Sequence, residues 1–315
     1  MKKNDSIYVA GGQSGLVGTA IVRNLRGKGY THILLCSRTQ VDLLNKDAVE
    51  RFFKKNRPMY VFLAAAKVGG IWANNTQKAD FIYDNLQIQT NIIYNAWKYN
   101  VKKLLFLGSS CIYPCKAKQP IKEEYFMTGP LEPTNDAYAM AKIAGIKMCQ
   151  SFNDQYKTNF VSVMPTNLYG PNDNFDLNDS HVLPAMIRKI HEAKIQNKKE
   201  VVLWGNGAPK REFLYVDDMA DACVFLMEHY NKSEIINIGC GKDQTIKELA
   251  HIVKKVVGFK GIITWDTTKP NGMMKKQLSV KKLFSFGWRP KVSLLKGIQT
   301  EYEWFLIHEK EIVRN

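Results

Sequence analysis

The sequence predicts an α/β fold with a doubly wound parallel sheet, and two observations carry this prediction. Short apolar runs alternate with helical patterns along the first half of the chain, and strands joined by helices form parallel sheets with right-handed crossovers. A glycine-rich turn follows the first apolar run, as is typical of such folds. With 315 residues and 45% apolar content, the chain can bury one large core or two modest ones.

The predicted elements follow one another in a regular order up to Met164. Apolar runs predict strands at 6–10, 32–36, 60–66, 103–108, 160–164 and 235–238. Amphipathic patterns predict helices at 19–28, 46–56, 81–100 and 137–156. Beyond Met164 the pattern becomes irregular, and residues 172–179 form a polar loop. The regular alternation of strands and helices therefore does not continue into the later part of the chain.

The glycine-rich turn predicts a dinucleotide site. Gly12, Gly15 and Gly18 have the spacing G-x-x-G-x-x-G between a predicted strand and a predicted helix. The first two allow a tight turn and close approach to a pyrophosphate, and Gly18 allows the helix to pack closely on the strand. The N-terminus of the helix that follows supplies N–H groups and a dipole that favour phosphate. An ordinary turn is the alternative, but this placement favours a cofactor in a Rossmann fold.

The end of the second predicted strand indicates which cofactor is bound. It lacks the acidic residue that would bind a ribose 2′-hydroxyl, and Ser37 and Arg38 stand there instead. An Arg at this position suits the 2′-phosphate of NADPH. A solvated surface Arg is the alternative reading. Asp42 is a further candidate for contact with the adenine end.

A candidate proton donor lies near the middle of the chain. Tyr138 and Lys142 are four residues apart in a predicted helix and therefore share one face. The ammonium is expected to stabilise a phenolate and lower the pKa of Tyr138. Ser109, at the end of a predicted strand, offers a hydroxyl to the oxygen being reduced. Together these residues predict carbonyl reduction beside a hydride source.

These features resemble the extended short-chain dehydrogenase/reductases that act on nucleotide sugars, and among them the GDP-L-fucose synthase family. The glycine turn and the Ser109, Tyr138 and Lys142 set occur in the same order. The resembling stretches run from the glycine turn to about residue 240 and comprise 63–71, 73–75, 107–114, 164–171, 180–182, 211–214 and 216–218.

The resemblance implies an NADPH-dependent oxidoreductase acting on a GDP-4-keto-6-deoxy sugar, with C3/C5 epimerisation followed by C4 reduction. It assigns Cys111 and His181 to the epimerisation. The C4 ketone acidifies the protons on C3 and C5, so a thiolate can remove one and an imidazolium can return one to the opposite face. The thiol needs a positive neighbour to ionise, and His181 could serve only if the fold brings the two together.

The resemblance also implies the residues that bind each ligand. For the cofactor they are Gly12, Gly15, Leu16, Val17, Gly18, Arg38, Asp42, Leu63, Ala64, Ala65, Lys142, Pro165, Thr166, Asn167 and His181. For the substrate they are Ser110, Asn167, Val182, Arg188, Trp204 and Arg211. An aromatic ring such as Trp204 can stack on guanine, and an Arg can bridge diphosphate oxygens. Core packing is the alternative role for Trp204.

Residues around the Tyr/Lys pair discriminate between related reactions. Sugar-nucleotide 4,6-dehydratases carry an acidic pair after the active-site Ser or Thr, whereas Ser110, Cys111 and Ile112 stand here. Simple C4 epimerases usually carry a small inert residue in place of Cys111. A buried structural thiol is the alternative for Cys111, and a satisfied polar residue is the alternative for His181.

Some questions stay open at this stage. A reductase of C4 alone, acting on a GDP-4-keto-6-deoxy hexose or heptose that a separate enzyme epimerises, could share every catalytic residue. Gln13 and Ser14 stand where many relatives have a basic residue, so the preference for NADPH depends mainly on Arg38. A cofactor-sensing protein on a degenerate reductase is disfavoured because Ser109, Tyr138 and Lys142 are all present.

Composition excludes several other classes of protein. The net charge of +16 is spread along the chain without a basic arm, which favours a solvated surface over nucleic-acid binding. No apolar run is long enough to span a bilayer, and no secretory signal follows Met1. Six scattered cysteines without a C-x-x-C pair argue for a cytoplasmic protein with no metal site. The family resemblance further implies a homodimer through helices 81–100 and 137–156.

The resemblance divides the chain into two domains. A cofactor-binding domain is expected at 1–170 plus about 213–240. A second, smaller α/β domain that binds the nucleotide sugar is expected at about 171–212 plus 241–315. The return to the first domain is implied by the family alone.

Overall fold

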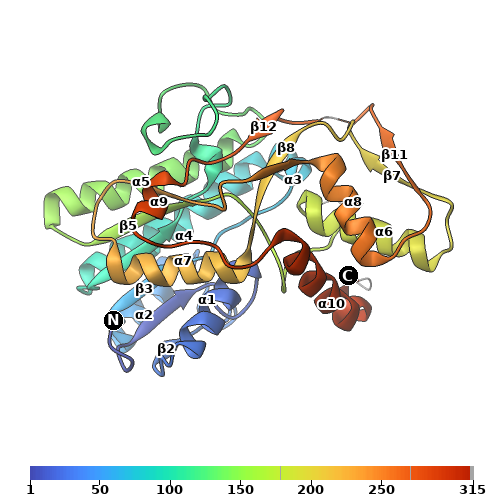
Figure 1. The fold of residues 1–315 in the computed structure, drawn as a ribbon. Helices are drawn as coiled ribbons and strands as arrows, with labels where there is room; N and C mark the ends of the chain where they lie inside the picture. Colours follow the sequence, from blue (N-terminus) through green and yellow to red (C-terminus); the bar gives the residue numbers. More distant parts are fainter. Residues whose placement is uncertain (178, 270, 313–315) are drawn as a thin grey trace.

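The centre of the computed structural model, which describes residues 1–177, 179–269 and 271–312, is a six-stranded parallel sheet (Figure 1). Residue 178 of the predicted polar loop and residues 313–315 of the predicted second domain lie outside the described residues. The strands lie in the order β2-β1-β3-β4-β5-β9, and every neighbouring pair is parallel. Their bounds are β1 Ile7–Ala10, β2 Ile33–Leu34, β3 Tyr60–Leu63, β4 Lys103–Leu107, β5 Phe160–Pro165 and β9 Ile236–Ile238. The predicted doubly wound sheet is confirmed.

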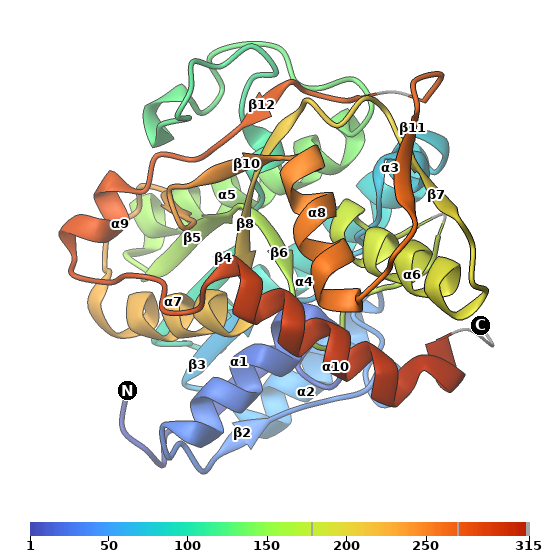
Figure 2. The same cartoon turned by 45° about the vertical axis from the view of Figure 1, so that its right-hand side comes forward.

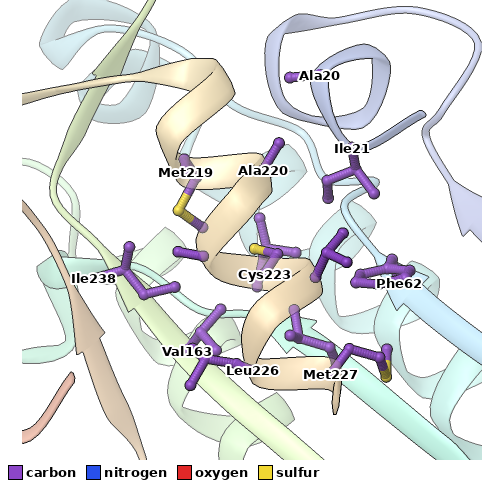
Figure 3. Close-up of a cluster of buried hydrophobic side chains, with 14 of the residues drawn as sticks. Ala20, Ile21, Phe62, Val163, Met219, Ala220, Cys223, Leu226, Met227 and Ile238 are labelled. Atoms are coloured by element: carbon purple, nitrogen blue, oxygen red, sulfur yellow. The ribbon is translucent and has the colours of Figure 1, made fainter. Parts of the chain in front are cut away.

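Helices cover both faces of this sheet. On one face, α1 and α7 share a buried cluster with the strands, in which Ile21, Phe62 and Cys223 lie close together (Figure 3). On the other face, α2, α4 and α5 pack around Phe53, Ile92 and other apolar side chains. The bounds are α1 Leu16–Gly27, α2 Lys46–Asn56, α3 Ile71–Thr76, α4 Lys78–Lys98, α5 Asp136–Tyr156 and α7 Val216–His229. All four predicted helices are present, whereas the short α3 and the later α7 were not predicted.

A second region lies beside the large sheet and contains two small sheets (Figures 1 and 2). In one, β8 pairs with β6, β10 and β12, and in the other β7 pairs with β11. Helices α6, α8 and α10 pack on them around Ile187, Val253 and Phe305. The bounds are β6 Asn167–Tyr169, α6 Val182–Ile195, β7 Glu200–Trp204, β8 Lys210–Tyr215, β10 Asp243–Thr245, α8 Ile246–Val257, β11 Ile262–Asp266, β12 Lys275–Lys276 and α10 Leu294–Ile312. Helix α9 (Lys281–Ser285) instead packs on β9 of the large sheet, and its Leu283 joins that sheet's core.

The chain passes between the two regions more than once. After β8 it forms α7 on the large sheet and β9 at the edge of that sheet, and β10 then returns to the small sheet. Helix α8 begins at a capping box in which Thr245 and Glu248 satisfy each other's backbone N–H groups, and it ends at Gly258 in the left-handed region. These local signals fix where α8 begins and ends.

No helix among the described residues is long and apolar enough to cross a membrane. Within those same residues, no cluster of His, Cys, Asp and Glu could hold a metal ion.

Candidate active site

The glycine turn joins β1 to α1 and leaves space for a ligand. Gly15 has a φ of 82°, and nothing lies within 4 Å of the position that a Cβ would take there. Gly18, by contrast, packs so closely that a Cβ would lie 1.9 Å from the carbonyl oxygen of Gly11. The open side of Gly15 at the start of α1 fits a pyrophosphate, because helix N-termini attract anions.

Two further glycines of the turn have packing roles. Gly11 also has a positive φ, of 85°, and a Cβ on it would approach the backbone of Ala65 to 2.9 Å. Gly12 packs against Leu35 and Val9, so its role here is close packing. Gly11 directly precedes Gly12 but is not one of the three motif glycines, so the motif did not predict its role.

The ends of neighbouring strands border the same edge of the sheet as the glycine turn. Leu63 is buried at the end of β3, and the N–H of Ala64 donates to the carbonyl of Ala10 on β1. Ala64 and Ala65 are half-buried there. Ligands of doubly wound sheets bind outside the carboxyl ends of the strands, so this edge is where a cofactor fits.

Three residues, the last of β5 and the two that follow it, connect this edge to the second region. Pro165 ends β5 and is half-buried. The hydroxyl of Thr166 and the side-chain amide of Asn167 both donate to the carbonyl of Glu212 on β8, at 3.2 and 2.8 Å. Their side chains therefore hold β8 against the large sheet.

Arg38 lies beyond β2 with its side chain exposed, as a partner for a charged phosphate would be. Asp42 accepts a hydrogen bond from the N–H of Leu44, at 3.1 Å, in the turn before α2. That bond explains the local role of Asp42 and leaves its second carboxylate oxygen available.

The predicted carbonyl-reducing residues meet at the end of β4. Ser109 precedes the short helical turn η1 (Ser110–Ile112); its hydroxyl oxygen accepts from the N–H of Cys111 at 3.3 Å and lies close enough to Tyr138 to lower the pKa of that phenol. Tyr138 and Lys142 lie one turn apart on α5. The Lys142 ammonium donates to the carbonyl of Leu107 at 2.8 Å and lies 5.7 Å from the centre of the Tyr138 ring. The fold thus brings all three predicted residues together.

The pKa of Tyr138 differs from the one expected from the sequence, and the pKa of Lys142 is also shifted. Burial raises the pKa of Tyr138, the nearby Cys111 adds to the rise, and only the bond to Ser109 opposes it. Burial lowers the pKa of Lys142 to about 8. The expected lowering of the Tyr138 pKa by Lys142 is therefore wrong for the free protein, because Lys142 is buried, Tyr138 is half-buried, and desolvation is the larger effect on both.

Cys111 lies on the same turn as Ser109 and lines a small pocket. The pocket walls are Ser110, Cys111, Tyr113, Pro114, Ile121, Glu132, Asn135, Met273 and Lys276. Burial raises the pKa of the Cys111 thiol, whereas Lys276, Ser109 and Lys142 lower it, Lys276 most strongly. The buried side-chain oxygen of Asn135 has no hydrogen-bond partner in the structure, as expected where a polar ligand binds.

His181 stands immediately before α6. Part of its side chain is open to solvent, yet the surrounding protein and then the charge of Lys276 lower its pKa. His181 is not among the groups that shift the pKa of Cys111, whereas Lys276 affects both. The positive neighbour of the thiol is therefore Lys276, which no motif in the sequence singles out.

The end of β7 carries an exposed aromatic ring with two cations close to it. Trp204 ends β7 and is 50% exposed, so core packing is not its role. The ammonium groups of Lys189 and Lys269 lie 4.7 and 5.6 Å from its ring centre. Val182, at the start of α6, is also exposed. Trp204 thus keeps a ring face within reach of solvent for stacking.

Two arginines were predicted to bind substrate, and they differ in their surroundings. Arg211 lies on β8, where burial lowers its pKa, and its guanidinium donates to the carbonyl of Lys210. Arg188 instead donates to Glu192 at 2.8 Å and to the carbonyl of Phe175 at 3.2 Å. The structure therefore favours Lys189 over Arg188 as the cation beside Trp204, because consecutive residues of a helix point in different directions.

Comparison with known proteins gives a consistent result. The model of the NAD dependent epimerase/dehydratase family matches residues 7–239. GDP-L-fucose synthase 1 of Arabidopsis thaliana is 57% identical over 304 residues, which are 96% of this chain and 94% of that protein.

Two solved structures have the same fold. A GDP-6-OMe-4-keto-L-xylo-heptose reductase from C. jejuni is 41% identical with a TM-score of 0.92, covering 98% of this chain and 99% of that one. A GDP-mannoheptose C4 reductase from Campylobacter jejuni, solved with NADP bound, is 42% identical with a TM-score of 0.89, covering 97% and 99%.

Proposed function

Since the chain belongs to the NAD dependent epimerase/dehydratase family and, within it, to the GDP-L-fucose synthase family, we propose that it is an NADPH-dependent epimerase/reductase. Its substrate is a GDP-4-keto-6-deoxy sugar, which it epimerises at C3 and C5 and then reduces at C4. One observation carries the proposal: Ser109, Tyr138 and Lys142 meet at the end of β4, and Cys111 on the adjoining turn shares a cationic neighbour, Lys276, with His181.

For reduction, the protein places a proton donor beside the carbonyl oxygen. NADPH, when bound, supplies the hydride. Tyr138 gives its proton to O4, and its raised pKa keeps that proton in place until charge develops on the oxygen. Ser109 orients the same oxygen through its hydroxyl. Lys142 binds the nicotinamide ribose and supplies positive charge beside the phenolate.

For epimerisation, Cys111 and His181 provide one proton donor and one acceptor. The raised pKa of Cys111 keeps a thiol, and the lowered pKa of His181 keeps a neutral imidazole. In the free protein, His181 is therefore the group ready to accept a proton, and Cys111 is the group ready to give one. This is the reverse of the roles expected from sequence, although each inversion passes through a thiolate in either direction.

Cofactor and sugar nucleotide occupy opposite parts of the cleft in this proposal. The open glycine turn binds the pyrophosphate and Arg38 binds the 2′-phosphate of NADPH. Trp204 stacks on guanine, and Arg211 and Lys189 bind the diphosphate. Residues 1–170 plus about 213–240 form the cofactor domain, and about 171–212 plus 241–315 form the substrate domain.

The proposal is tested with purified protein, NADPH and GDP-4-keto-6-deoxy-mannose, followed by loss of absorbance at 340 nm and identification of the sugar product. A GDP-linked L-fucose product is expected. A product reduced at C4 with C3 and C5 unchanged would remove epimerisation from the proposal.

A C4 reductase without epimerase activity is the second candidate. The likeness to two Campylobacter reductases of GDP-linked heptoses favours it, since both are more than 40% identical over nearly the whole chain. A GDP-4-keto heptose offered in parallel with the hexose separates the two functions. Faster NADPH oxidation with the heptose, and no inversion of either sugar, would support this candidate.

We further propose a homodimer and a cytoplasmic location. Tyr94 on α4 and Tyr156 on α5 are exposed beside Trp97 and Phe152, as expected for a helix pair that buries aromatic rings against a second copy. All six cysteines are free thiols, which suits a reducing compartment. Sedimentation of the purified protein would reveal the dimer.

A further inference from the structure

Lys276 is a cation in the cleft to which the reaction outlined above gives no role. It lies on the two-residue strand β12, half-buried, and lines the same small pocket as Cys111 and Glu132. In sequence it is 165 residues away from Cys111. Only the folded chain therefore places its ammonium near the thiol.

Backbone pairing with β8 holds one edge of strand β12. β12 runs parallel to β8, with Lys276 paired to Arg211 and Lys275 paired to Lys210. Successive residues of a strand point to opposite faces. Lys275 accordingly makes an ion pair with Asp243 at 3.1 Å, outside the pocket, while Lys276 lines the pocket wall.

A second set of bonds holds the residues after β12. The N–H of Ile121 donates to the carbonyl of Gln277 at 2.8 Å, and the N–H of Ser279 donates to the carbonyl of Ile121 at 2.7 Å. The N–H of Leu278 donates to the buried carboxylate of Glu212 at 2.8 Å. The backbone at Lys276 is therefore held by β8 and, through the residues that follow, by Ile121 and Glu212.

The charge of Lys276 shifts the pKa of Cys111 and of His181. Lys276 opposes the rise in the Cys111 pKa more strongly than Ser109 or Lys142 does. It also lowers the pKa of His181. Its ammonium thus favours a thiolate and a neutral imidazole.

Other charged groups act on Lys276 itself. Burial lowers the pKa of Lys276, Arg211 lowers it further, and Cys111 and Glu132 raise it. A thiolate at Cys111 therefore helps to keep Lys276 charged, and the charged Lys276 helps to keep the thiolate. The two groups stabilise each other's ionised forms.

We propose that Lys276 is the positioning residue for the Cys111 thiolate, stabilising the ionised sulfur that each inversion at C3 or C5 passes through. The inference rests on the proposed function, because it gives the thiolate its use in epimerisation. Lys276 acts through Cys111 and is not required for hydride transfer.

The test measures ionisation of Cys111 without any sugar nucleotide. Intact protein is alkylated with iodoacetamide at a series of pH values, and modification of Cys111 is followed by peptide mass spectrometry. A Cys115→Ser background is used because Cys115 lies in the same tryptic peptide. Lys276→Met should raise the pH midpoint for alkylation by about one unit, since an opposite charge nearby typically shifts a pKa by one unit or more.

Two variants separate charge from structure. Lys276→Arg keeps the charge and should restore the midpoint close to that of the parent protein. Lys275→Met removes a cation from the same strand but outside the pocket, and should leave the midpoint unchanged. Lys276→Gln replaces Lys276→Met if the latter does not fold, with the same shift expected.

An unchanged midpoint in Lys276→Met and Lys276→Gln would overturn the inference, as would an equal shift in Lys275→Met. Failure of the proposed function would appear differently. The parent protein would then leave NADPH unoxidised with every GDP-4-keto sugar, while the alkylation midpoint still depended on Lys276.

Discussion

The two sides of the cleft are assembled from different parts of the chain. On the reducing side, Ser109, Tyr138 and Lys142 come from η1 and α5, which lie close together in sequence and pack against the same edge of the large sheet. On the epimerising side, Lys276 on β12 lines the same pocket as Cys111, and its charge acts on both Cys111 and on His181 before α6. The reducing side uses two elements that lie within residues 109–142, whereas the other side combines three elements that are far apart in sequence.

This difference has a mechanistic consequence. The reducing side is held by a rigid helix and a buried Lys142, so its geometry follows from the large sheet alone. The epimerising side exists only when the second region is docked on the first. Substitutions should therefore separate the two activities, and four variants test that separation in order of expected effect.

Tyr138→Phe should abolish reduction and spare epimerisation. The hydroxyl is the proton donor to O4, and loss of a general acid typically costs about 10³-fold in rate. NADPH oxidation is the readout for reduction, and solvent exchange at C3 and C5 is the readout for epimerisation. Tyr83→Phe, at an exposed position on α4, is the matched control. Normal turnover in Tyr138→Phe would contradict the proton-donor role.

Cys111→Ser should have the opposite pattern. A serine hydroxyl neither donates nor accepts the proton as readily as the thiol, so exchange at C3 and C5 should fall about 10²-fold. Reduction of a substrate that is already epimerised should continue. Cys115→Ser, a few residues away, is the control. If exchange persists in Cys111→Ser, another group carries the proton.

Arg38→Ala should act only through the cofactor. Loss of a charged hydrogen bond to the 2′-phosphate should weaken NADPH binding about 10- to 100-fold and leave NADH binding nearly unchanged. Exchange at C3 and C5 measured without cofactor should not change. Arg26→Ala, on the exposed side of α1, is the control. Equal losses for both cofactors would make Arg38 a surface residue.

Glu301→Gln should alter stability and neither activity. Glu301 on α10 is fully buried and close to Asp173, and burial raises the pKa of both carboxyls. A raised pKa in the folded state means that stability is highest below the unfolded values near pH 4 and falls as pH rises towards the folded values. The variant should flatten this fall, by about 1.4 kcal/mol for each unit of pKa shift removed.

Thermal unfolding of Glu301→Gln at pH 5 and pH 8 is the measurement, with the exposed Glu303→Gln as the control. A gain at pH 8 that is larger than the gain at pH 5 is expected. The same pH dependence in both variants would show that the buried pair is not its source.

The parts of the molecule that sequence predicts are those built from local patterns. Alternating strands and helices predicted the large sheet, and the glycine turn predicted the ligand-sized space at Gly15. The place of Lys276 could not be predicted, because β12 is two residues long and is positioned by Ile121 and Glu212 from distant segments. The raised pKa of Tyr138 was also missed, since desolvation depends on burial that a helical spacing does not show.

Incubation of the protein with GDP-4-keto-6-deoxy-mannose in D₂O, with and without NADPH, tests the central claim most directly. Deuterium at C3 and C5 and cofactor oxidation are followed in the same samples. We predict deuterium at both carbons even without NADPH, and reduction at C4 when NADPH is added. NADPH oxidation with no deuterium at either carbon would contradict the claim that both chemistries share this cleft.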